Sequence, residues 1–229
     1  MCTIAKGWRF CITCSDVIVS RVETVKYLGY TLDELLSGSQ QVAGCIKRIA
    51  SRLSFLYRNA PQLDSDSRKT LCNVLIQPHF DYCMATWYNG ALASQKNRLD
   101  ALQRRMVRFI GSLDFRAHVD GRDLKCLGWL SVPDRAKYFR LLHVFRIHKG
   151  TAPPYLMQGF QRVNAVHRYT TRGSTSNFHF PRVTGNDIVH KGFFLNGVKD
   201  WNALPNALKA CSQEAVFKTK LKEHFLSSY

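Results

Sequence analysis

The spacing of hydrophobic residues divides the chain into a strand-like start and a helical remainder. Near the N-terminus, Trp8, Phe10 and Ile12 alternate with Arg, Cys and Thr residues, which is the period of a half-buried β-strand. Residues 22–32 are rich in Val, Thr and Tyr and predict a second strand, interrupted near Gly29. A sheet of only two or three strands is unstable alone in water. We therefore expect them to pack on the following helices or on a domain outside this chain.

Beyond this start, apolar residues recur every three or four positions, which is the spacing of amphipathic α-helices. The pattern predicts helices that begin at Ser39, after Asp64, at Ser94, at Ser131 and after Ser212. Pro61 should end the first helix and Gly150 the fourth. Residues 151–190 are rich in Gly, Ser, Thr, Asn and His and predict loops. We therefore expect a mainly α fold, with a small N-terminal β-hairpin and a loop-rich helical C-terminal region.

The same spacing predicts which side chains form the core. One apolar face belongs to the first helix and comprises Val42, Ile46, Ile49, Leu53, Leu56 and Tyr57. The corresponding face of the third helix comprises Leu99, Leu102, Met106 and Ile110. Large aromatic side chains are more often buried than exposed, so Trp87, Trp129 and Trp201 are also expected in the core.

The charge balance of the chain is strongly basic. Lysine and arginine total 33 against 16 aspartates and glutamates, which gives a formal net charge of +17 and an isoelectric point near 9.8. Nucleic acid is the commonest partner of such a protein, and a membrane surface is the next. No stretch approaches the ~20 apolar residues that span a bilayer, and the N-terminus lacks the features of a signal peptide. We expect no membrane partner and a location in the nucleus or cytoplasm, not secretion.

Basic residues concentrate in the first and third predicted helices. The first contains no acidic residue, and the third contains only Asp100. Arg48 and Arg52 lie one helical turn apart, as do Arg104 and Arg108, so each pair could contact successive phosphates. The predicted nucleic-acid-binding residues are Lys47, Arg48, Arg52, Arg58, Arg98, Arg104, Arg105 and Arg108. The alternative is that these residues form an ordinary solvated helix face.

Residues that could carry metal binding or catalysis are few. Cys11 and Cys14 have the spacing of half a zinc site, but the sequence offers no second pair to complete it. The eight cysteines lie mostly within helical patterns, so we expect reduced and mostly buried thiols. His79 and Asp81 are only two residues apart, which does not favour a catalytic pair. We expect no metal site and no hydrolase activity.

Six short strings, in order, resemble the C-terminal part of non-LTR retrotransposon reverse transcriptases. Residues 25–29 (VKYLG) resemble the primer-grip hairpin of that family. Residues 75–83 (LIQPHFDYC) and 102–110 (LQRRMVRFI) resemble segments of its thumb. The remaining matches are LGWL at 127–130, KG at 149–150 with PPYL at 153–156, and WNALP at 201–205.

The resemblance implies three consecutive segments. They are a palm-edge β remnant over residues 1–36, a basic helical thumb over 37–115 and a C-terminal helical region over 116–229. It also implies that Tyr27, Leu28 and Gly29 correspond to the primer grip. The implied partner is RNA or DNA, as a template–primer duplex, together with the palm and fingers that the chain lacks.

The resemblance also implies what the chain cannot do by itself. Polymerases of this family hold magnesium ions with aspartates, two of them adjacent in a YxDD turn, and no adjacent Asp–Asp pair occurs here. That turn would precede residue 1, so we expect no catalytic residue, no cofactor in this chain and no polymerisation by it alone. Two alternatives stay open, namely a helical interaction or scaffold protein and a gene-model fragment without function.

Overall fold

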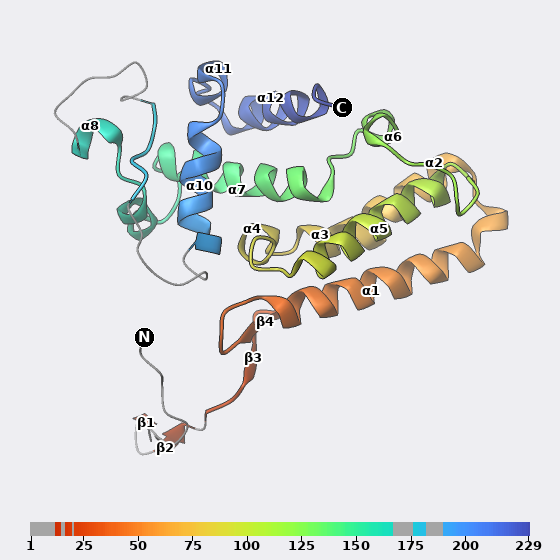
Figure 1. Cartoon of the computed structure of the whole chain (residues 1–229), viewed down its shortest axis with the longest axis horizontal. Coiled ribbons are helices and arrows are strands. Elements are labelled where there is room, and N and C mark those ends of the chain that lie inside the picture. The colour runs from red at the N-terminus through yellow and green to blue at the C-terminus, as the bar shows by residue number, and fades with distance from the viewer. Residues whose placement is uncertain (1–11, 15–16, 20, 167–175, 182–189) are drawn as a thin grey trace.

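The computed structural model describes residues 12–14, 17–19, 21–166, 176–181 and 190–229. These residues form a mainly helical structure with small antiparallel hairpins at its N-terminal end (Figure 1), which confirms the predicted fold class. The hairpins are formed by β1 (Ile12–Cys14) with β2 (Val17–Val19), and by β3 (Thr24–Tyr27) with β4 (Tyr30–Asp33). The predicted strand residues Trp8 and Phe10 lie outside the described part of the chain.

The interruption predicted near Gly29 is a hairpin turn. Tyr27 pairs with Tyr30 in the register of β3 and β4, so the chain reverses at Leu28 and Gly29. The φ angles of these two residues are 48° and 84°. Two consecutive positive φ angles define a type I′ turn, whose twist matches that of the flanking strands. Residues 22–32 therefore supply β3 and part of β4 rather than one interrupted strand.

The first helix, α1 (Ser39–Arg58), has the buried face that the sequence predicts. Its side chains are at most 5% exposed at Val42, Ile46, Ile49, Leu53 and Leu56. Tyr57 is only half-buried, at the edge of that face. The helix ends at Arg58, and Pro61 lies in the short 3₁₀ helix η1 (Ala60–Gln62), as expected of a residue that cannot continue the hydrogen-bond ladder.

The second helical stretch has three consecutive parts: α2 (Ser65–Leu71), the π-helical turn η2 (Cys72–Ile76) and α3 (Gln77–Asp81). Asp64 begins it as predicted, because its carboxylate accepts a hydrogen bond from the Ser67 N–H at 2.8 Å. Pro78 has no N–H to donate to the carbonyl of Val74, four residues earlier. The helix widens into a π turn just before this proline, which is a recognised way to relieve such a clash.

Four helices follow: α4 (Met84–Trp87), α5 (Ala93–Ile110), α6 (Gly121–Leu127) and α7 (Val132–His148). The predicted starts of α5 and α7 are confirmed, and the Ser131 hydroxyl caps α7 by accepting from the Asp134 N–H at 3.3 Å. The sequence analysis missed α6, although it begins with a capping box. Asp120 accepts from the Arg122 N–H, and Asp123 accepts from the Asp120 N–H at 2.9 Å.

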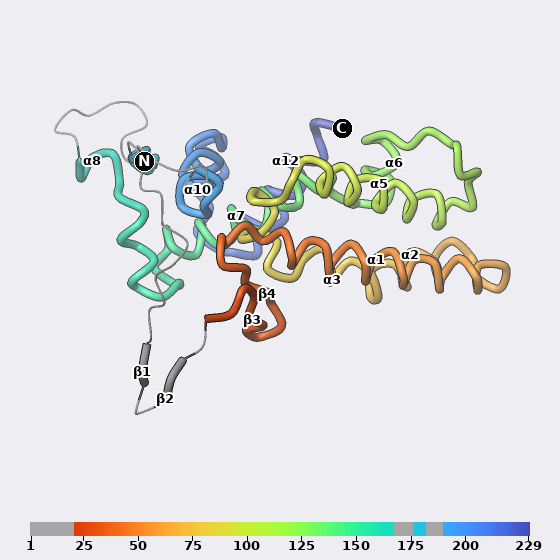
Figure 2. Tube along the Cα trace, turned by 60° about the horizontal axis from the view of Figure 1, so that its bottom comes forward, coloured from red at the N-terminus to blue at the C-terminus, as the bar shows by residue number. Residues whose placement is uncertain are grey.

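The C-terminal region contains η3 (Pro154–Gly159), α8 (Val163–Val166), α10 (Phe193–Asn202), α11 (Asn206–Lys209) and α12 (Glu214–Leu226). The last of these confirms the helix predicted after Ser212, whereas α10 was not predicted. In both overall views, α8 and α10 lie at one end of the molecule and the connection between α1 and α2 at the other (Figures 1 and 2). The described parts of residues 151–190 include the short elements η3 and α8 and an isolated β-bridge between Arg162 and Phe178.

The buried apolar residues form two clusters, and α7 contributes to both. Its first half, with Val132 and Ala136, packs on α3, α4 and α5 in the cluster that also contains the buried face of α1. Its second half, from Leu141 on, packs with α10 and α12. Trp87 and Trp129 lie in the first cluster and Trp201 in the second, each at most 5% exposed, as predicted. Whether the chain divides at residues 36 and 115 stays a prediction.

His148 lies among the aromatic rings of the second cluster. The His148 ring centroid is 5.0 Å from that of Trp201 and 5.9 Å from that of Phe178. Its Nδ1 is buried and unpartnered. Burial lowers the pKa of His148 to about 4, and the positive charges of Arg162 and Lys149 act in the same direction. The fold therefore holds this histidine in its neutral form.

We predict that His148 makes the protein less stable in mild acid. The unfolded chain protonates His148 near pH 6.5, whereas the folded chain does so only near pH 4. Its contribution to stability is complete above pH 6.5 and is lost as the pH falls from 6.5 to 4. Urea unfolding across this range should therefore show a flatter pH dependence for His148→Phe than for the wild-type protein. Equal slopes for the two proteins would contradict the prediction.

Candidate nucleic-acid interface

Helices α1 and α5 lie side by side and run in the same direction. At their N-terminal ends, the Gln95 side chain donates a hydrogen bond to the Ser39 carbonyl at 3.1 Å. At their C-terminal ends, the Tyr57 hydroxyl donates to the Arg105 carbonyl at 3.0 Å. Both helices run lengthwise through the same half of the molecule (Figure 1). The surface between two parallel helices is a groove, and the two most basic helices of the chain form this one.

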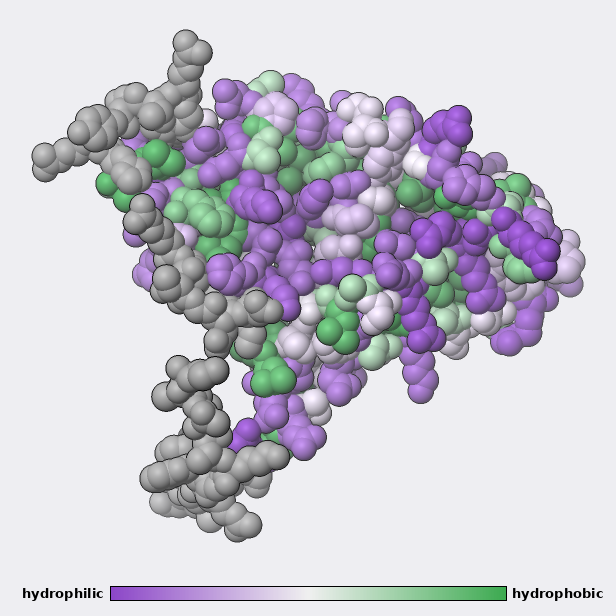
Figure 3. Space-filling view, in the orientation of Figure 1, coloured by the Kyte–Doolittle hydropathy of each residue, from purple (hydrophilic) through white to green (hydrophobic). Residues whose placement is uncertain are grey.

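Two depressions mark the groove. The first, of about 470 Å³, is lined by Ala43, Ile46, Lys47, Ala50, Ser94, Gln95 and Arg98. The second, of about 400 Å³, is lined by Tyr57, Ala101, Arg105, Arg108 and Phe115. The small residues Ala43, Ala50, Ser94 and Ala101 line the depressions together with the long basic side chains. No carboxylate lines either depression. Figure 3 shows that hydrophilic side chains cover much of the visible face, with small hydrophobic patches between them.

The acidic residues of the described chain act mainly within the fold. Asp33, Asp64 and Asp120 accept hydrogen bonds from backbone N–H groups at turns and helix starts. Others form ion pairs. These are Glu34 with Arg21, Asp81 with Arg135, Asp134 with Lys137, Asp200 with Arg140, and Glu214 with Arg146 and Lys218. Among the described residues, none of the eight predicted nucleic-acid-binding side chains forms an ion pair. Their positive charges are thus left for an outside partner.

The second depression is partly preorganised by contacts within the protein. The Arg105 guanidinium lies 4.9 Å from the centre of the Tyr57 ring, as a cation–π contact. Arg108 donates from Nε to the Ala117 carbonyl at 2.8 Å. Arg108 therefore also holds the loop after α5 in place. Phe115, on that loop, is 74% exposed at the edge of the depression.

The structure does not bring all eight predicted residues to one surface. Lys47, Arg98, Arg105 and Arg108 line the groove. Arg48 and Arg52 lie on another flank of α1, because each residue turns an α-helix by about 100°. Arg58 and Arg104 are exposed but line neither depression.

Arg48 and Arg52 lie near a histidine of α3. Burial lowers the pKa of His79, and the positive charges of Arg52 and Arg48 lower it further. The backbone of His79 also joins α3 to α1, since its carbonyl accepts a hydrogen bond from the Cys45 thiol at 2.9 Å. These two arginines therefore form a second basic surface, distinct from the groove.

The predicted primer-grip residues lie on the hairpin and not in the groove. Tyr27 is 65% exposed and Leu28 is 80% exposed. The Tyr82 hydroxyl donates a hydrogen bond to the Leu28 carbonyl, which ties the turn to the end of α3. Near the start of β4, the Gln41 side chain accepts from the Thr31 N–H at 3.1 Å. The helices thus hold the hairpin, as the sequence analysis expected of so small a sheet.

Sequence reasoning missed the small residues on the groove floor and the exposed ring beside it. Ala43 and Ala50 lie seven residues apart in α1, as Ser94 and Ala101 do in α5. Two turns of a helix bring such residues to the same side, so this spacing is the signal that could have identified the contact. Nothing in the sequence around Phe115 indicates that it lies next to the groove.

The described residues show no sign of a metal site. Within them, no group of three or more His, Cys, Asp or Glu side chains is close enough to hold an ion. Cys11, half of the Cys11–Cys14 pair, lies outside the described part of the chain. Three free thiols are buried, those of Cys45, Cys72 and Cys211, whereas Cys83 and Cys126 are exposed.

Neither the helices nor the comparisons with known proteins assign the chain to a class of protein. Among the described helices, none is both long enough and apolar enough to cross a membrane. No protein-family model, curated protein or solved structure matches the chain.

We predict that removing the two arginines of the second basic surface raises the pKa of His79. The double substitution Arg48→Gln/Arg52→Gln removes two positive charges that disfavour protonation, while burial of the ring is unchanged. NMR titration of the His79 ring protons would measure the shift. The matched control Arg58→Gln/Arg104→Gln removes the same charge elsewhere on α1 and α5 and should leave the titration unchanged. Identical midpoints in all three proteins would contradict the assigned geometry.

Proposed function

We propose that the chain binds nucleic acid along the groove between α1 and α5. The observation that supports this is the groove lining, where four basic side chains meet no carboxylate. Contacts with phosphates supply most of the affinity in such complexes and do not depend on base sequence. The proposed partner is therefore a strand of RNA or DNA, or a template–primer duplex.

The spacing of the groove residues fits a phosphate backbone. Arg98 and Arg105 are seven residues apart in α5, which is roughly 10 Å along a helix that rises 1.5 Å per residue. A nucleic-acid strand rises about 3.4 Å per nucleotide, so the two arginines span about three nucleotides. Lys47 stands opposite Arg98 in the first depression and offers a contact from the other helix.

Aromatic rings at the second depression support contacts with bases as well. Phe115 is exposed there, and the Arg116 guanidinium lies 5.1 Å from its ring centre. Exposed rings flanked by cations can stack on unpaired bases without selecting a sequence. This arrangement fits a partner that is single-stranded at one end of the groove.

We further propose that the chain is the thumb and C-terminal region of a non-LTR retrotransposon reverse transcriptase. The six ordered strings support this identity, as does the order of a hairpin followed by basic helices. In this proposal the magnesium-binding aspartates belong to a palm outside this chain. The chain then grips the nucleic acid and does not polymerise alone.

The exposed hairpin supports a protein contact in addition to nucleic acid. Val25, Tyr27, Leu28, Leu35 and Leu36 are each at least half exposed, within twelve residues of one another. Grouped apolar side chains of this size commonly mark a surface that another protein covers. In the proposed polymerase that protein surface is the palm. In the alternative of a scaffold protein it is another partner.

We predict that the groove determines how binding depends on salt. The double substitution Lys47→Ala/Arg98→Ala removes two phosphate contacts from the first depression without removing any interaction within the described structure. The slope of log K against log salt should become shallower by roughly 0.9 per lost duplex contact, or 0.7 for a single strand. Fluorescence anisotropy with a labelled duplex and a labelled strand, each at four salt concentrations, would measure it.

The control for this test carries the same change in charge away from the groove. Lys199→Ala/Lys220→Ala removes two exposed cations from α10 and α12. This control should shift affinity only slightly and leave the slope near the wild-type value. Equal slopes for the groove variant and the wild-type protein, or equal losses in both variants, would refute the groove as the binding surface.

A further inference from the structure

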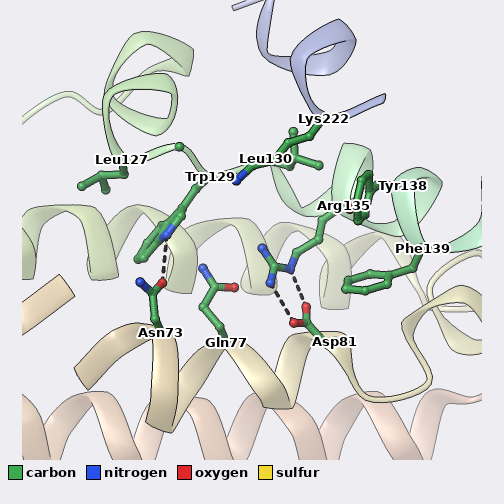
Figure 4. A pocket seen from close by; sticks show the side chains of 11 residues that line it. Asn73, Gln77, Asp81, Leu127, Trp129, Leu130, Arg135, Tyr138, Phe139 and Lys222 are labelled. Carbon is green, nitrogen blue, oxygen red and sulfur yellow. Dashed lines mark hydrogen bonds and ion pairs between the residues drawn. The ribbon is translucent and has the colours of Figure 1, made fainter. Parts of the chain in front are cut away.

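A polar pocket lies between the two halves of the molecule, on elements separate from the α1–α5 groove. It has a volume of about 390 Å³ and lies between η2, α3, the start of α7 and α12 (Figure 4). Pockets that hold small ligands typically measure about 300–1,000 Å³. The Trp129 ring forms one wall, and the Arg135 guanidinium faces it across the pocket.

The floor of the pocket carries a polar side chain that is largely buried. Gln77 is only 5% exposed, and its amide makes no hydrogen bond to any residue that the structure describes. Figure 4 shows this amide pointing into the pocket, between Asn73 and Arg135. Buried polar groups in folded proteins are almost always hydrogen-bonded. The Gln77 amide therefore offers a donor and an acceptor to a polar molecule that enters the pocket.

The neighbouring side chains are held in fixed positions and leave further groups available. The Asn73 Oδ1 accepts from the Trp129 Nε1 at 3.0 Å, so its amide N–H groups stay free. Arg135 donates from Nε and Nη2 to the two carboxylate oxygens of Asp81, and its Nη1 stays free. This ion pair neutralises Asp81 and fixes the guanidinium plane. Lys222 stands at the rim and forms no ion pair with a described carboxylate.

The local helix geometry explains why two amides share this floor. Asn73 lies within the π-helical turn η2, and Gln77 follows directly after it. The two residues are four positions apart, so one helical turn brings both side chains to the same pocket. Single π turns occur frequently at functional sites.

We propose that this pocket binds one unpaired nucleotide. A carboxamide donates and accepts in one plane, which matches the edge of a nucleobase, and Asn and Gln are common readers of such edges. The Trp129 ring and the Arg135 guanidinium are planar surfaces on which a base can stack. The Lys222 amine at the rim lies where it can meet the negative charge of a phosphate. The proposal extends the proposed function by a second site with its own residues.

The experiment uses the intact protein and free mononucleotides, so it does not depend on binding in the groove. Calorimetric titration with AMP, GMP, CMP and UMP is compared with ribose 5-phosphate and inorganic phosphate. We expect at least one nucleotide to bind about tenfold more tightly than phosphate, because loss of one or two hydrogen bonds changes affinity by about that factor. The indole N–H signal of Trp129 in the NMR spectrum should shift on binding.

Matched variants assign the binding to the pocket. Gln77→Met keeps the size of the side chain and should weaken nucleotide binding about tenfold. Lys222→Gln should weaken binding of the nucleotide but not of the corresponding nucleoside, whereas Lys220→Gln, on the same helix outside the pocket, should change neither. The groove variant Lys47→Ala/Arg98→Ala should bind nucleotides as the wild-type protein does, which separates failure of this site from failure of the groove.

Three outcomes would overturn the proposal. They are no binding of any nucleotide at about 10 mM, equal affinity for phosphate and nucleotides, and unchanged affinity in the Gln77 and Lys222 variants. If Gln77→Met does not fold, the comparison of Lys222→Gln with Lys220→Gln decides the result, because both lysines are exposed on the surface of α12.

Discussion

The positions of a small number of carboxylates determine which surfaces of this protein keep a positive charge. Basic residues outnumber acidic ones by 33 to 16, and most described carboxylates are engaged inside the fold as caps or ion-pair partners. Arg140 shows the consequence for packing, since it is 3% exposed and its Nε donates to Asp200 at 2.8 Å. Breaking such a pair would leave a buried charge, which is strongly unfavourable. The carboxylates that stabilise the core are thus unavailable to neutralise α1 and α5.

The sequence predicts those helices whose apolar residues lie on one side. The buried faces of α1 and α5 could be named residue by residue because each packs on one core and exposes its other side. In contrast, α6 has only seven residues, and α10 follows a long segment without a clear period. The capping pattern at Asp120 could have indicated α6, and the spacing of Leu195, Val198 and Trp201, each three positions apart, could have indicated α10.

The candidate site was predictable as a set of residues but not as a surface. Charge and spacing identify the basic side chains of α1 and α5. The relative rotation and direction of the two helices come from packing, to which Gln95 and Tyr57 contribute through long-range hydrogen bonds. Lys47 and Arg48 face different surfaces because each residue turns a helix by about 100°, but only the packing decides which of the two lines the groove. The pocket beside Gln77 likewise depends on how α3 packs against α7, which hydrophobic spacing does not show.

The shared direction of α1 and α5 has an electrostatic consequence for the groove. Aligned peptide dipoles place partial positive charge at helix N-termini and partial negative charge at C-termini. Two parallel helices therefore sum their dipoles instead of cancelling them, so one end of the groove would repel an anion. Arg58 and Arg108 lie in the last turns of the two helices and offset that negative end. The positive potential can thereby extend over both ends, and a polyanion meets no reversal of sign along its path.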